Sequence, residues 1–454
     1  MRLIAVCLCM ALSLFGASHG NAASDTQELS RAQALLLGRS FLAEGRAAPA
    51  EAIAAALLRA APQDGEAQVL MAAALQAQGQ YTQARAFARA GHRMGESDQT
   101  RFEGAMLAGR SDLQRKAYGR AQFWLRRAAQ VAPDDGAREL AARNFQQVRR
   151  INPLDIAFNL GLRQSSNINN GTSTDVITLL GLPFRVSGDS RALSGLEFST
   201  DLALRYRLDQ AARHETSLTL GLATRSYRLS SSARAQAPEA RAGDYAFQRF
   251  ELGLMHVRAP SEGQSRYEIG AAFGRSWYAG RPLGDHVRLT VAQTRVLRPS
   301  TVLKLSATGQ HQWRRDASRR NATRTGVAAE LRHALAGGDR LVVHLGAEHT
   351  QAQSIHIRNT ATRAGLGYAL AQPVLGMRLD TALDLEERRF PAGAFQPDGR
   401  RDQTATLGLS AMFETVDYMG FAPVLRLELS NTESNIEIHK RNEANISVQI
   451  RSRF

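Results

Sequence analysis

From residue 156 to the end of the chain, apolar residues fall at every second position over long stretches. In one of them the apolar set is Leu375, Met377, Leu379, Leu383 and Leu385, with polar or small residues between its members. A strand built in this way has one apolar and one polar face. The stretches run for about 10 to 15 residues, nearer to the 9 to 11 of a tilted membrane strand than to the 5 or 6 of a globular strand. The pattern predicts a transmembrane antiparallel β-barrel.

The alternating stretches and their connections support this fold. The sequence predicts fourteen strands, at 156–165, 192–207, 213–228, 244–257, 265–278, 285–298, 300–313, 321–335, 340–353, 357–371, 374–387, 401–414, 421–431 and 436–454. An even number places both ends of a barrel on one side of the membrane. The connections at 166–191, 229–243 and 388–400 are long, and those at 208–212, 298–299, 337–338 and 372–373 are mostly short. Long outer loops and short inner turns are typical of outer-membrane barrels, whereas a soluble β-sandwich gives no reason for such parity.

The last predicted strand ends on an aromatic residue. Its apolar face holds Ala444, Ile446, Val448, Ile450 and Phe454, and its other face is polar. A terminal Phe on an amphipathic strand resembles the signal that the barrel-assembly machinery reads. We therefore expect Phe454 to be a barrel-insertion signal and that machinery to be a partner.

Residues 24–150 follow a helical pattern instead, rich in Ala and poor in β-branched residues. Small and large positions recur 34 residues apart, where Gly38, Phe41, Gly45, Ala50 and Ala54 are matched by Ala72, Leu75, Gly79, Ala84 and Ala88. A third unit with three inserted residues matches Tyr81 and Ala84 with Tyr118 and Ala121, and continues to Leu125, Ala128 and Pro133. This period resembles the α-helical tetratricopeptide repeat. The alternative is an Ala-rich helical bundle with chance matches. Stacked repeats would present a concave surface to an extended peptide or a partner's helix.

The N-terminus indicates export. Arg2 precedes an apolar run at 3–15, and small residues up to Ala22 and Ala23 follow, as in a secretory signal peptide. Both cysteines, Cys7 and Cys9, lie in this segment, so the mature chain would hold no thiol. We expect a signal peptide at 1–23, a periplasmic repeat domain at 24–150, a linker at 151–155 and an outer-membrane barrel at 156–454.

The net charge of +15 first suggests nucleic acid, but export makes an intracellular nucleic-acid partner improbable, and we expect none. Many arginines fall on the polar strand faces, which would line the lumen, because a lipid-facing Arg at mid-membrane costs about 2 to 4 kcal/mol. Acidic residues share these faces. The mixed charge either keeps the lumen wet, or contacts an acidic passenger or lipopolysaccharide phosphates; outer-membrane lipids are expected partners as well.

Nothing in the sequence indicates catalysis, a cofactor or a metal. The histidines are scattered, and the nucleophile-elbow, zinc-protease and P-loop motifs are not found. The nearest candidates for a metal site are His344, Glu348 and His349. On a strand the first two share a face while His349 points to the other, so the three cannot converge without a bulge.

Two stretches carry a family resemblance. Ser166, Asn167, Ile168, Asn169 and Asn170 directly follow the first predicted strand. The C-terminal stretch contains Gly420-Phe421-Ala422-Pro423, Ser430-Asn431, Ser434-Asn435, Arg441 and Arg453-Phe454. Together with helical repeats before a fourteen-stranded barrel, these resemble the surface lipoprotein assembly modulator (Slam) family over nearly the whole mature chain.

The resemblance implies an outer-membrane translocator of a surface lipoprotein or small secreted protein, with periplasmic repeats that handle the passenger. Two questions stay open. The alternative function is a passive diffusion porin that carries periplasmic repeats. Asn167, Asn169 and Asn170 either shape the loop, since Asn tolerates positive φ and bonds to backbone groups, or act directly in gating or on the passenger.

Overall fold

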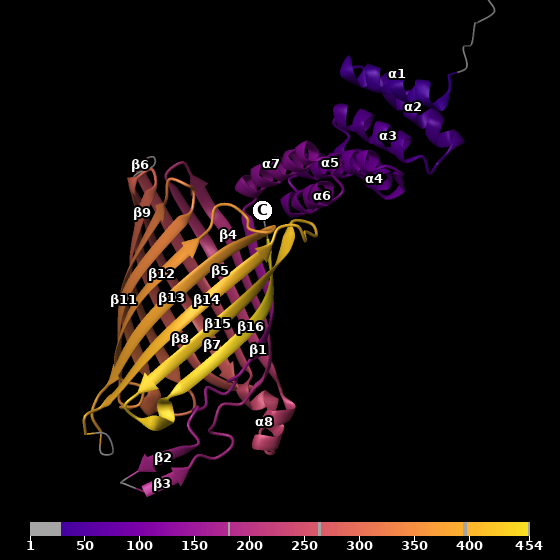
Figure 1. The fold of residues 1–454 in the computed structure, drawn as a ribbon. Coiled ribbons are helices and arrows are strands. Elements are labelled where there is room, and N and C mark those ends of the chain that lie inside the picture. Colours follow the sequence, from indigo (N-terminus) through magenta and orange to yellow (C-terminus); the bar gives the residue numbers. More distant parts are fainter. Residues whose placement is uncertain (1–28, 180–181, 262–264, 394–396, 453–454) are drawn as a thin grey trace, which may run out of the picture.

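The structure is a computed structural model that describes residues 29–179, 182–261, 265–393 and 397–452. The predicted signal peptide at 1–23 and Phe454 lie outside the described residues. The described chain has two parts, a stack of helices and a β-barrel, and the helices lie at one end of the barrel (Figure 1). None of the helices in these ranges is long and apolar enough to cross a membrane.

Seven helices form three pairs and a final helix, and confirm the predicted helical repeats. They are α1 Arg31–Ala43, α2 Ala47–Ala60, α3 Gly65–Ala77, α4 Tyr81–Met94, α5 Asp98–Gln114, α6 Tyr118–Gln130 and α7 Asp135–Ile151. The side chains of Ser30, Asp64, Ser97 and Asp134 cap the N-termini of α1, α3, α5 and α7. Each cap accepts bonds from backbone N–H groups that have no partner within the helix. The second helix of each pair follows a tight turn and has no such cap.

The predicted repeat residues lie where the helices cross and turn. Ala50, Ala72, Ala84 and Ala121 are fully buried. A Cβ on Gly38 would approach the Leu70 side chain to 2.5 Å. Small residues are needed at such points because helix axes pack only about 8 to 10 Å apart.

The turns of the three pairs share one conformation. Gly45 and Gly79 have φ of 75° and 77°, and Lys116 takes the equivalent place in the third pair with φ of 56°. Tyr81 and Tyr118 then begin the second helices of their pairs, and Pro133 lies between α6 and α7. The Gly-to-Lys exchange and a longer α5 explain why the third unit matches less well in sequence.

The second part is a closed antiparallel barrel of fourteen strands, as predicted. Its strands are β1 Leu154–Ser165, β4 Gly195–Ala211, β5 His214–Leu229, β6 Phe247–Ser261, β7 Ser265–Tyr278, β8 Arg281–Arg298, β9 Thr301–Arg314, β10 Ala322–Ala334, β11 Arg340–Ala352, β12 Asn359–Ala369, β13 Met377–Phe390, β14 Arg400–Phe413, β15 Phe421–Ser434 and β16 Arg441–Ser452. Each pairs with its sequence neighbours, β1 pairs with β4, and β16 closes the barrel on β1. Most predicted strands overlap the observed ones within a few residues.

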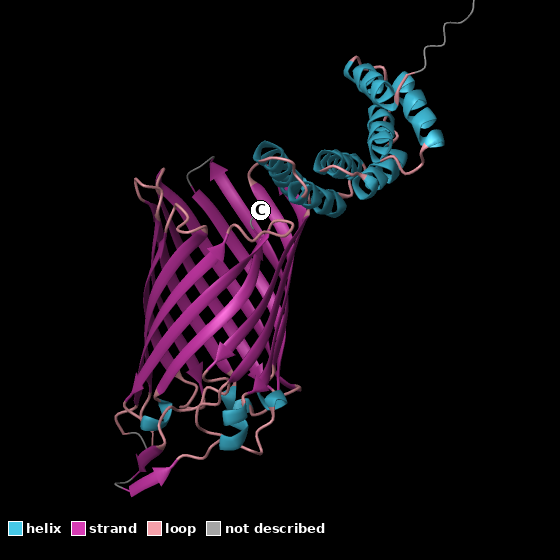
Figure 2. Ribbon diagram, turned by 45° about the vertical axis from the view of Figure 1, so that its right-hand side comes forward, coloured by secondary structure: helices cyan, strands magenta, loops and turns pink. Residues whose placement is uncertain are grey.

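The connections carry structure that alternation did not predict. The β1–β4 connection holds a separate hairpin, β2 Val176–Leu179 and β3 Leu182–Arg185, and the β5–β6 connection holds the helix α8 Ser231–Gln236 and the 3-10 helix η1 Ala242–Tyr245. These lie at the barrel end opposite the helical repeats (Figure 2). Two short 3-10 helices, η2 Ser318–Arg320 and η3 Glu437–His439, lie in other connections at that end.

Several predicted strand starts differ from the structure by a few residues, and two of them have a visible cause. The last strand was expected from 436, but η3 occupies its first residues and β16 begins at Arg441. Leu375 was expected in a strand, but it lies in the β12–β13 turn with φ of 51° and is 90% exposed. The alternation of apolar and polar residues continues through short turns of this kind. It therefore does not show at which residue the hydrogen-bonded strand begins.

The two faces of the barrel separate apolar from charged residues. On β1, Ile156, Phe158, Leu160 and Leu162 are exposed on the outer face, and apolar residues on the other strands continue this surface. The residues between them point inward. There, Arg163 lies 2.9 Å from Glu197, and comparable ion pairs are found around the lumen: Arg225–Asp201 and Arg363–Glu386. An apolar outside and a polar inside are what a membrane-spanning barrel requires.

Candidate functional site at the barrel seam

The seam where β16 closes on β1 is the shortest strand pairing of the barrel in the described chain. It joins residues 161–165 of β1 to residues 445–449 of β16, in five pairs. On its other side, β1 pairs with β4 over all of 154–165. Among the described residues, 158–160 of β1 and 450–451 of β16 therefore belong only to the ladders with β4 and β15, and not to a ladder with each other. The unpaired half of the seam faces the helical repeats.

The paired half is fastened by the Asn-rich stretch that the sequence singled out. Ser166 donates its backbone N–H to Ala444 O (3.3 Å), and Ala444 N donates to Ser166 Oγ (2.9 Å). Asn167 is 4% exposed, and its Nδ2 donates to Gly171 O at 2.9 Å and to the Glu443 carboxylate at 3.3 Å. Asn167 Oδ1 accepts the backbone N–H of Gly171. One side chain thus closes its own turn and crosses the seam.

The rest of this stretch ties the loop to itself. Asn169 Nδ2 donates to Asp189 O and Arg191 O, both at 2.8 Å, and Asn169 Oδ1 accepts from Leu193 N. Ile168 is buried in a small apolar cluster with Leu193. Asn170 has φ of 52°, a conformation that Asn tolerates better than most residues. Residues 166–170 therefore hold the β1–β4 connection in its fold through hydrogen bonds and apolar packing.

Further contacts cross the seam at this end. Thr172 Oγ1 donates to Lys440 O at 3.1 Å, and Ser173 N donates to the same oxygen at 3.0 Å. The backbone N–H of Thr178 donates to the Glu437 carboxylate at 2.7 Å. At the end of η3, burial and the neighbouring Arg400 lower the pKa of His439 to about 4, so His439 is neutral at physiological pH. The loop end of the seam is fastened by both backbone and side chains.

At the other end, α7 runs into β1 through two residues and is anchored to β4. Arg207 donates to the carbonyls of Arg149 (3.2 Å), Arg150 (2.8 Å) and Asn152. The last carbonyls of a helix have no partner within it, and this guanidinium supplies one. Arg149 also lies 3.6 Å from Asp155 of β1.

The neighbouring helix α6 is anchored instead to β15 and β16. Arg126 donates to Met419 O at 3.0 Å and to Ser452 Oγ at 2.8 Å. Its guanidinium lies 4.5 Å from the ring centres of both Phe145 and Phe421. Burial lowers the pKa of Arg126 to about 10, which keeps it charged at physiological pH. Sequence reasoning missed Arg126, because Met419 and Ser452, which accept hydrogen bonds from it, are 293 and 326 residues away along the chain.

The helical repeats also leave apolar and aromatic surface uncovered. Leu36 on α1 is 71% exposed and Leu37 is 37% exposed. On α6, Phe123 is 47% exposed and stacks edge-on against the buried Trp124, with Arg127 over its ring. The part of the repeats nearest the barrel therefore carries an exposed aromatic residue beside a cation.

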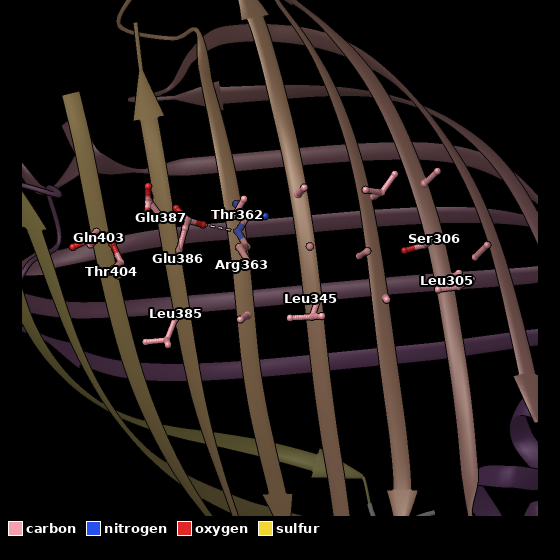
Figure 3. A pocket seen from close by; sticks show the side chains of 18 of the residues that line it. Leu305, Ser306, Leu345, Thr362, Arg363, Leu385, Glu386, Glu387, Gln403 and Thr404 are labelled. Atoms are coloured by element: carbon pink, nitrogen blue, oxygen red, sulfur yellow. Dashed lines mark hydrogen bonds and ion pairs between the residues drawn. The ribbon is translucent and has the colours of Figure 1, made fainter. Parts of the chain in front are cut away.

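The outer face of the barrel carries an apolar groove of about 1360 Å³ whose lining includes Leu305, Leu345 and Leu385 (Figure 3). Leu345 pairs with Ala364, so it lies on the face opposite to Arg363. Arg363 and Glu386 form an ion pair of 2.5 Å on the lumen side. The groove belongs to the surface that contacts lipid, and the charged pairs to the lumen.

The histidines considered for a metal site do not meet. His344 Nε2 lies 2.9 Å from the Asp384 carboxylate, whereas His349 forms a hydrogen bond of 3.2 Å with Thr360. Within the ranges that the structure describes, no group of three or more His, Cys, Asp and Glu residues is placed to hold a metal ion.

Among solved structures, the chain resembles the type III secretion translocator chaperone SycD of Yersinia enterocolitica (22% identity, 30% of this chain and 94% of that one, TM-score 0.25). It also resembles OprB of Pseudomonas putida (9% identity, 69% and 97%, TM-score 0.40) and the translocator domain of the autotransporter NalP of Neisseria meningitidis (10% identity, 70% and 97%, TM-score 0.28). These values describe general likeness of fold only. No curated protein matches the sequence.

The family comparison covers the barrel in full. The sequence pattern of the surface lipoprotein assembly modifier family matches residues 155–454, which is most of the chain and includes the seam with both of its strands. The chain belongs to the surface lipoprotein assembly modifier family.

Proposed function

We propose that this protein is an outer-membrane translocator that moves a surface lipoprotein, or a small secreted protein, from the periplasm to the cell surface. In this proposal the repeats bind the passenger and the barrel is its conduit. The observation that carries the proposal is that the repeats are fastened to the barrel rim on both sides of its shortest strand pairing, through Arg126 on one side and Arg207 on the other.

The orientation follows from the two ends of the barrel. The connections at the repeat end are short turns, such as 299–300 between β8 and β9, while the hairpin β2–β3 and α8 lie at the opposite end. Bacterial barrels have short periplasmic turns and longer outer loops. The repeats would then lie in the periplasm, where a newly exported passenger is found. We assign residues 24–150 to this domain and 156–454 to the barrel.

The repeats have surface suited to a polypeptide. Exposed Leu36 and Phe123 offer apolar contacts, and Arg127 adds a cation beside the aromatic ring. Diffusion of small solutes gives no reason for such a domain. A passenger segment held at Phe123 on α6 would lie beside the barrel, whereas α1 with Leu36 lies at the far end of the repeats (Figure 1).

The lumen suits a polar chain in transit. Its arginines are paired with carboxylates on neighbouring strands, as Arg163 is with Glu197, so both charges are partly satisfied without a ligand. A wall of this kind stays hydrated and offers no continuous apolar surface on which an unfolded segment could stall.

The proposal is tested with the full-length protein in an outer membrane. A candidate lipoprotein with an epitope tag is co-expressed with the protein or with an empty vector, and its surface exposure is measured by protease digestion of intact cells. Leu36→Glu, which places a charge on exposed repeat surface, should lower the exposed fraction. Arg138→Ala, at an exposed arginine of α7, is the matched control and should leave it unchanged.

A porin would behave differently. If no candidate passenger reaches the surface, while liposomes containing the purified protein swell readily in small sugars, the passive diffusion function replaces the translocator. If passengers are exposed and the liposomes exclude sugars, the translocator stands.

A further inference from the structure

We infer that Arg126 is a positioning residue that keeps the repeat-side half of the β1–β16 seam unzipped. This inference concerns the conformation of the barrel, and rests on the proposed function only for its consequence for export. The contact joins α6 to the last described residue of β16, because Arg126 donates to Ser452 Oγ.

The existing register defines how the seam would zip further. Gly161 pairs with Gln449, so the next pairs in the same antiparallel ladder would be Leu160 with Ile450, Asn159 with Arg451 and Phe158 with Ser452. These residues already have strand conformation, because β1 pairs with β4 and β16 pairs with β15 over the same positions. Backbone N–H and C=O groups left unpaired within a membrane cost several kcal/mol each. A seam free of other constraints would therefore close.

The helices explain why it stays open. α7 continues into β1, and α6 is attached to the β14–β15 turn at Met419 and to β16 at Ser452. Packed helices keep their axes about 8 to 10 Å apart, whereas neighbouring strands lie about 4.7 to 4.9 Å apart. Strands that are each fastened to one of two packed helices are held at the wider spacing. The α6–α7 pair is thus a wedge at this end of the seam.

Arg126 is the residue on which the wedge depends. Two of its hydrogen bonds reach the β14–β15 turn and the end of β16, and its planar group lies between Phe145 of α7 and Phe421 of β15. One side chain therefore holds α6, α7 and β15–β16 together. Gln130 adds a second contact one helical turn away, by accepting from Met419 N.

The structure holds β1 and β16 together at one end of the seam and apart at the other. At the loop end, Asn167 and Thr172 hold β1 and its connection against β16. At the repeat end, Arg126 and Arg207 fasten the two borders to different helices. The described β1 residues just before Gly161, among them Asn159 and Leu160, are thus kept apart from β16 beside the repeats, while the far end stays closed. A passenger segment leaving the repeats meets this edge first.

Crosslinking within the full-length protein tests the inference. Crosslinking between Asn159→Cys and Arg451→Cys measures how close β1 and β16 are in the half of the seam that is not paired. Both positions face the lumen, and they would lie opposite each other if the ladder between β1 and β16 were extended. Arg163→Cys with Ser447→Cys reports the half that is already paired. A short bifunctional thiol reagent is applied to outer membranes, and the crosslinked fraction is read from gel mobility. The native cysteines, Cys7 and Cys9, lie far from both pairs in the sequence.

The expected result is a low yield for the 159/451 pair with Arg126 present, a several-fold higher yield with Arg126→Ala, and an intermediate yield with Arg126→Lys. The 163/447 pair should crosslink equally in all three. Ser452→Ala, which removes one bond of the contact, should shift the 159/451 yield in the same direction and replaces Arg126→Ala if that variant fails to assemble.

Equal 159/451 yields with and without Arg126 would overturn the inference. Export provides a separate measurement, in which Arg126→Ala should reduce passenger exposure while Arg138→Ala does not. If the wild type exports no passenger at all, the proposed function fails, but the crosslinking yields still decide the role of Arg126.

Discussion

The side-chain amide of Asn167 and the carboxylate of Glu443 meet across the barrel seam, with Nδ2 donating to Oε1 at 3.3 Å. Asn167 follows the first barrel strand and Glu443 belongs to the last, and the two residues are 276 positions apart. The same amide closes a turn onto Gly171. The conformational role expected of these asparagines and a contact with the seam are therefore performed by one side chain.

The Asn167 contact leads to the first prediction. Asn167→Ala removes bonds to the buried Gly171 and the half-buried Glu443, and such a loss costs about 1 to 3 kcal/mol locally. The 166–194 connection should become more sensitive to protease in detergent-purified protein, as measured by mass spectrometry of the fragments. Asn321→Ala, which removes the acceptor of Arg314 N in the β9–β10 connection, should sensitise only its own loop. Unchanged cleavage within 166–194 would show that the other loop contacts suffice.

A second prediction concerns the turn of the third helix pair. Lys116 has φ of 56° where the other two pairs have Gly45 and Gly79. A residue with a Cβ pays roughly 1 kcal/mol or more in this conformation, and Gly does not. Lys116→Gly should therefore stabilise the repeats by about 1 kcal/mol in denaturant unfolding followed by helical circular dichroism. Gly79→Ala should destabilise them, and a stabilising effect of Gly79→Ala would contradict the argument.

The third prediction concerns the crossing of α4 and α5. A Cβ on Gly104 would lie 2.5 Å from His92 N and 2.8 Å from Ala88 O, both of them backbone atoms that cannot step aside. Gly104→Ala should separate the helices and lower repeat stability by about 1 to 3 kcal/mol, the usual cost of overpacking. In Gly119→Ala the new Cβ would meet nothing within 4 Å. This matched variant should be neutral or slightly stabilising, and equal losses in both would refute the steric explanation.

The fourth prediction is a pH dependence of the repeats. Burial, together with Arg127 and Arg101, lowers the pKa of His92 below its usual 6.5, although a bond to Arg101 O opposes the shift. As the pH falls below 6.5, the unfolded chain binds a proton on His92 before the folded chain does, so the repeats lose stability. The loss levels off once the folded pKa is passed. Unfolding midpoints should fall more between pH 7.5 and 5 in the wild type than in His92→Gln.

The comparison between wild type and His92→Gln isolates this residue, because the other titrating groups are shared. His92 packs edge-on against Trp124 and accepts from Arg127, so its protonation places two cations together. Equal slopes with pH in the two proteins would exclude His92 as the cause.

Much of the fold was predictable because it rests on local period. Apolar residues at every second position, Ile156, Phe158, Leu160 and Leu162, determine which face of β1 contacts lipid. A shift of the strand register by one residue would turn these side chains to the lumen. Recurrence at 34 residues placed small residues such as Ala84 at helix crossings. The family motif at 166–170 was found in sequence, but its partner Glu443 was not, since nothing local connects the two residues.

The amino-acid sequence by itself determined that this chain makes helical repeats followed by a fourteen-stranded barrel, because periodicity and chain order specify each element and its neighbours. Only the tertiary structure decided how that barrel closes. The seam joins the first strand to the last, and its length depends on where α6 and α7 hold β16 and β1. The contact between Arg126 and Ser452 joins residues 326 positions apart. Such contacts are set by the spacing of packed helices against paired strands, which no local pattern in the chain encodes.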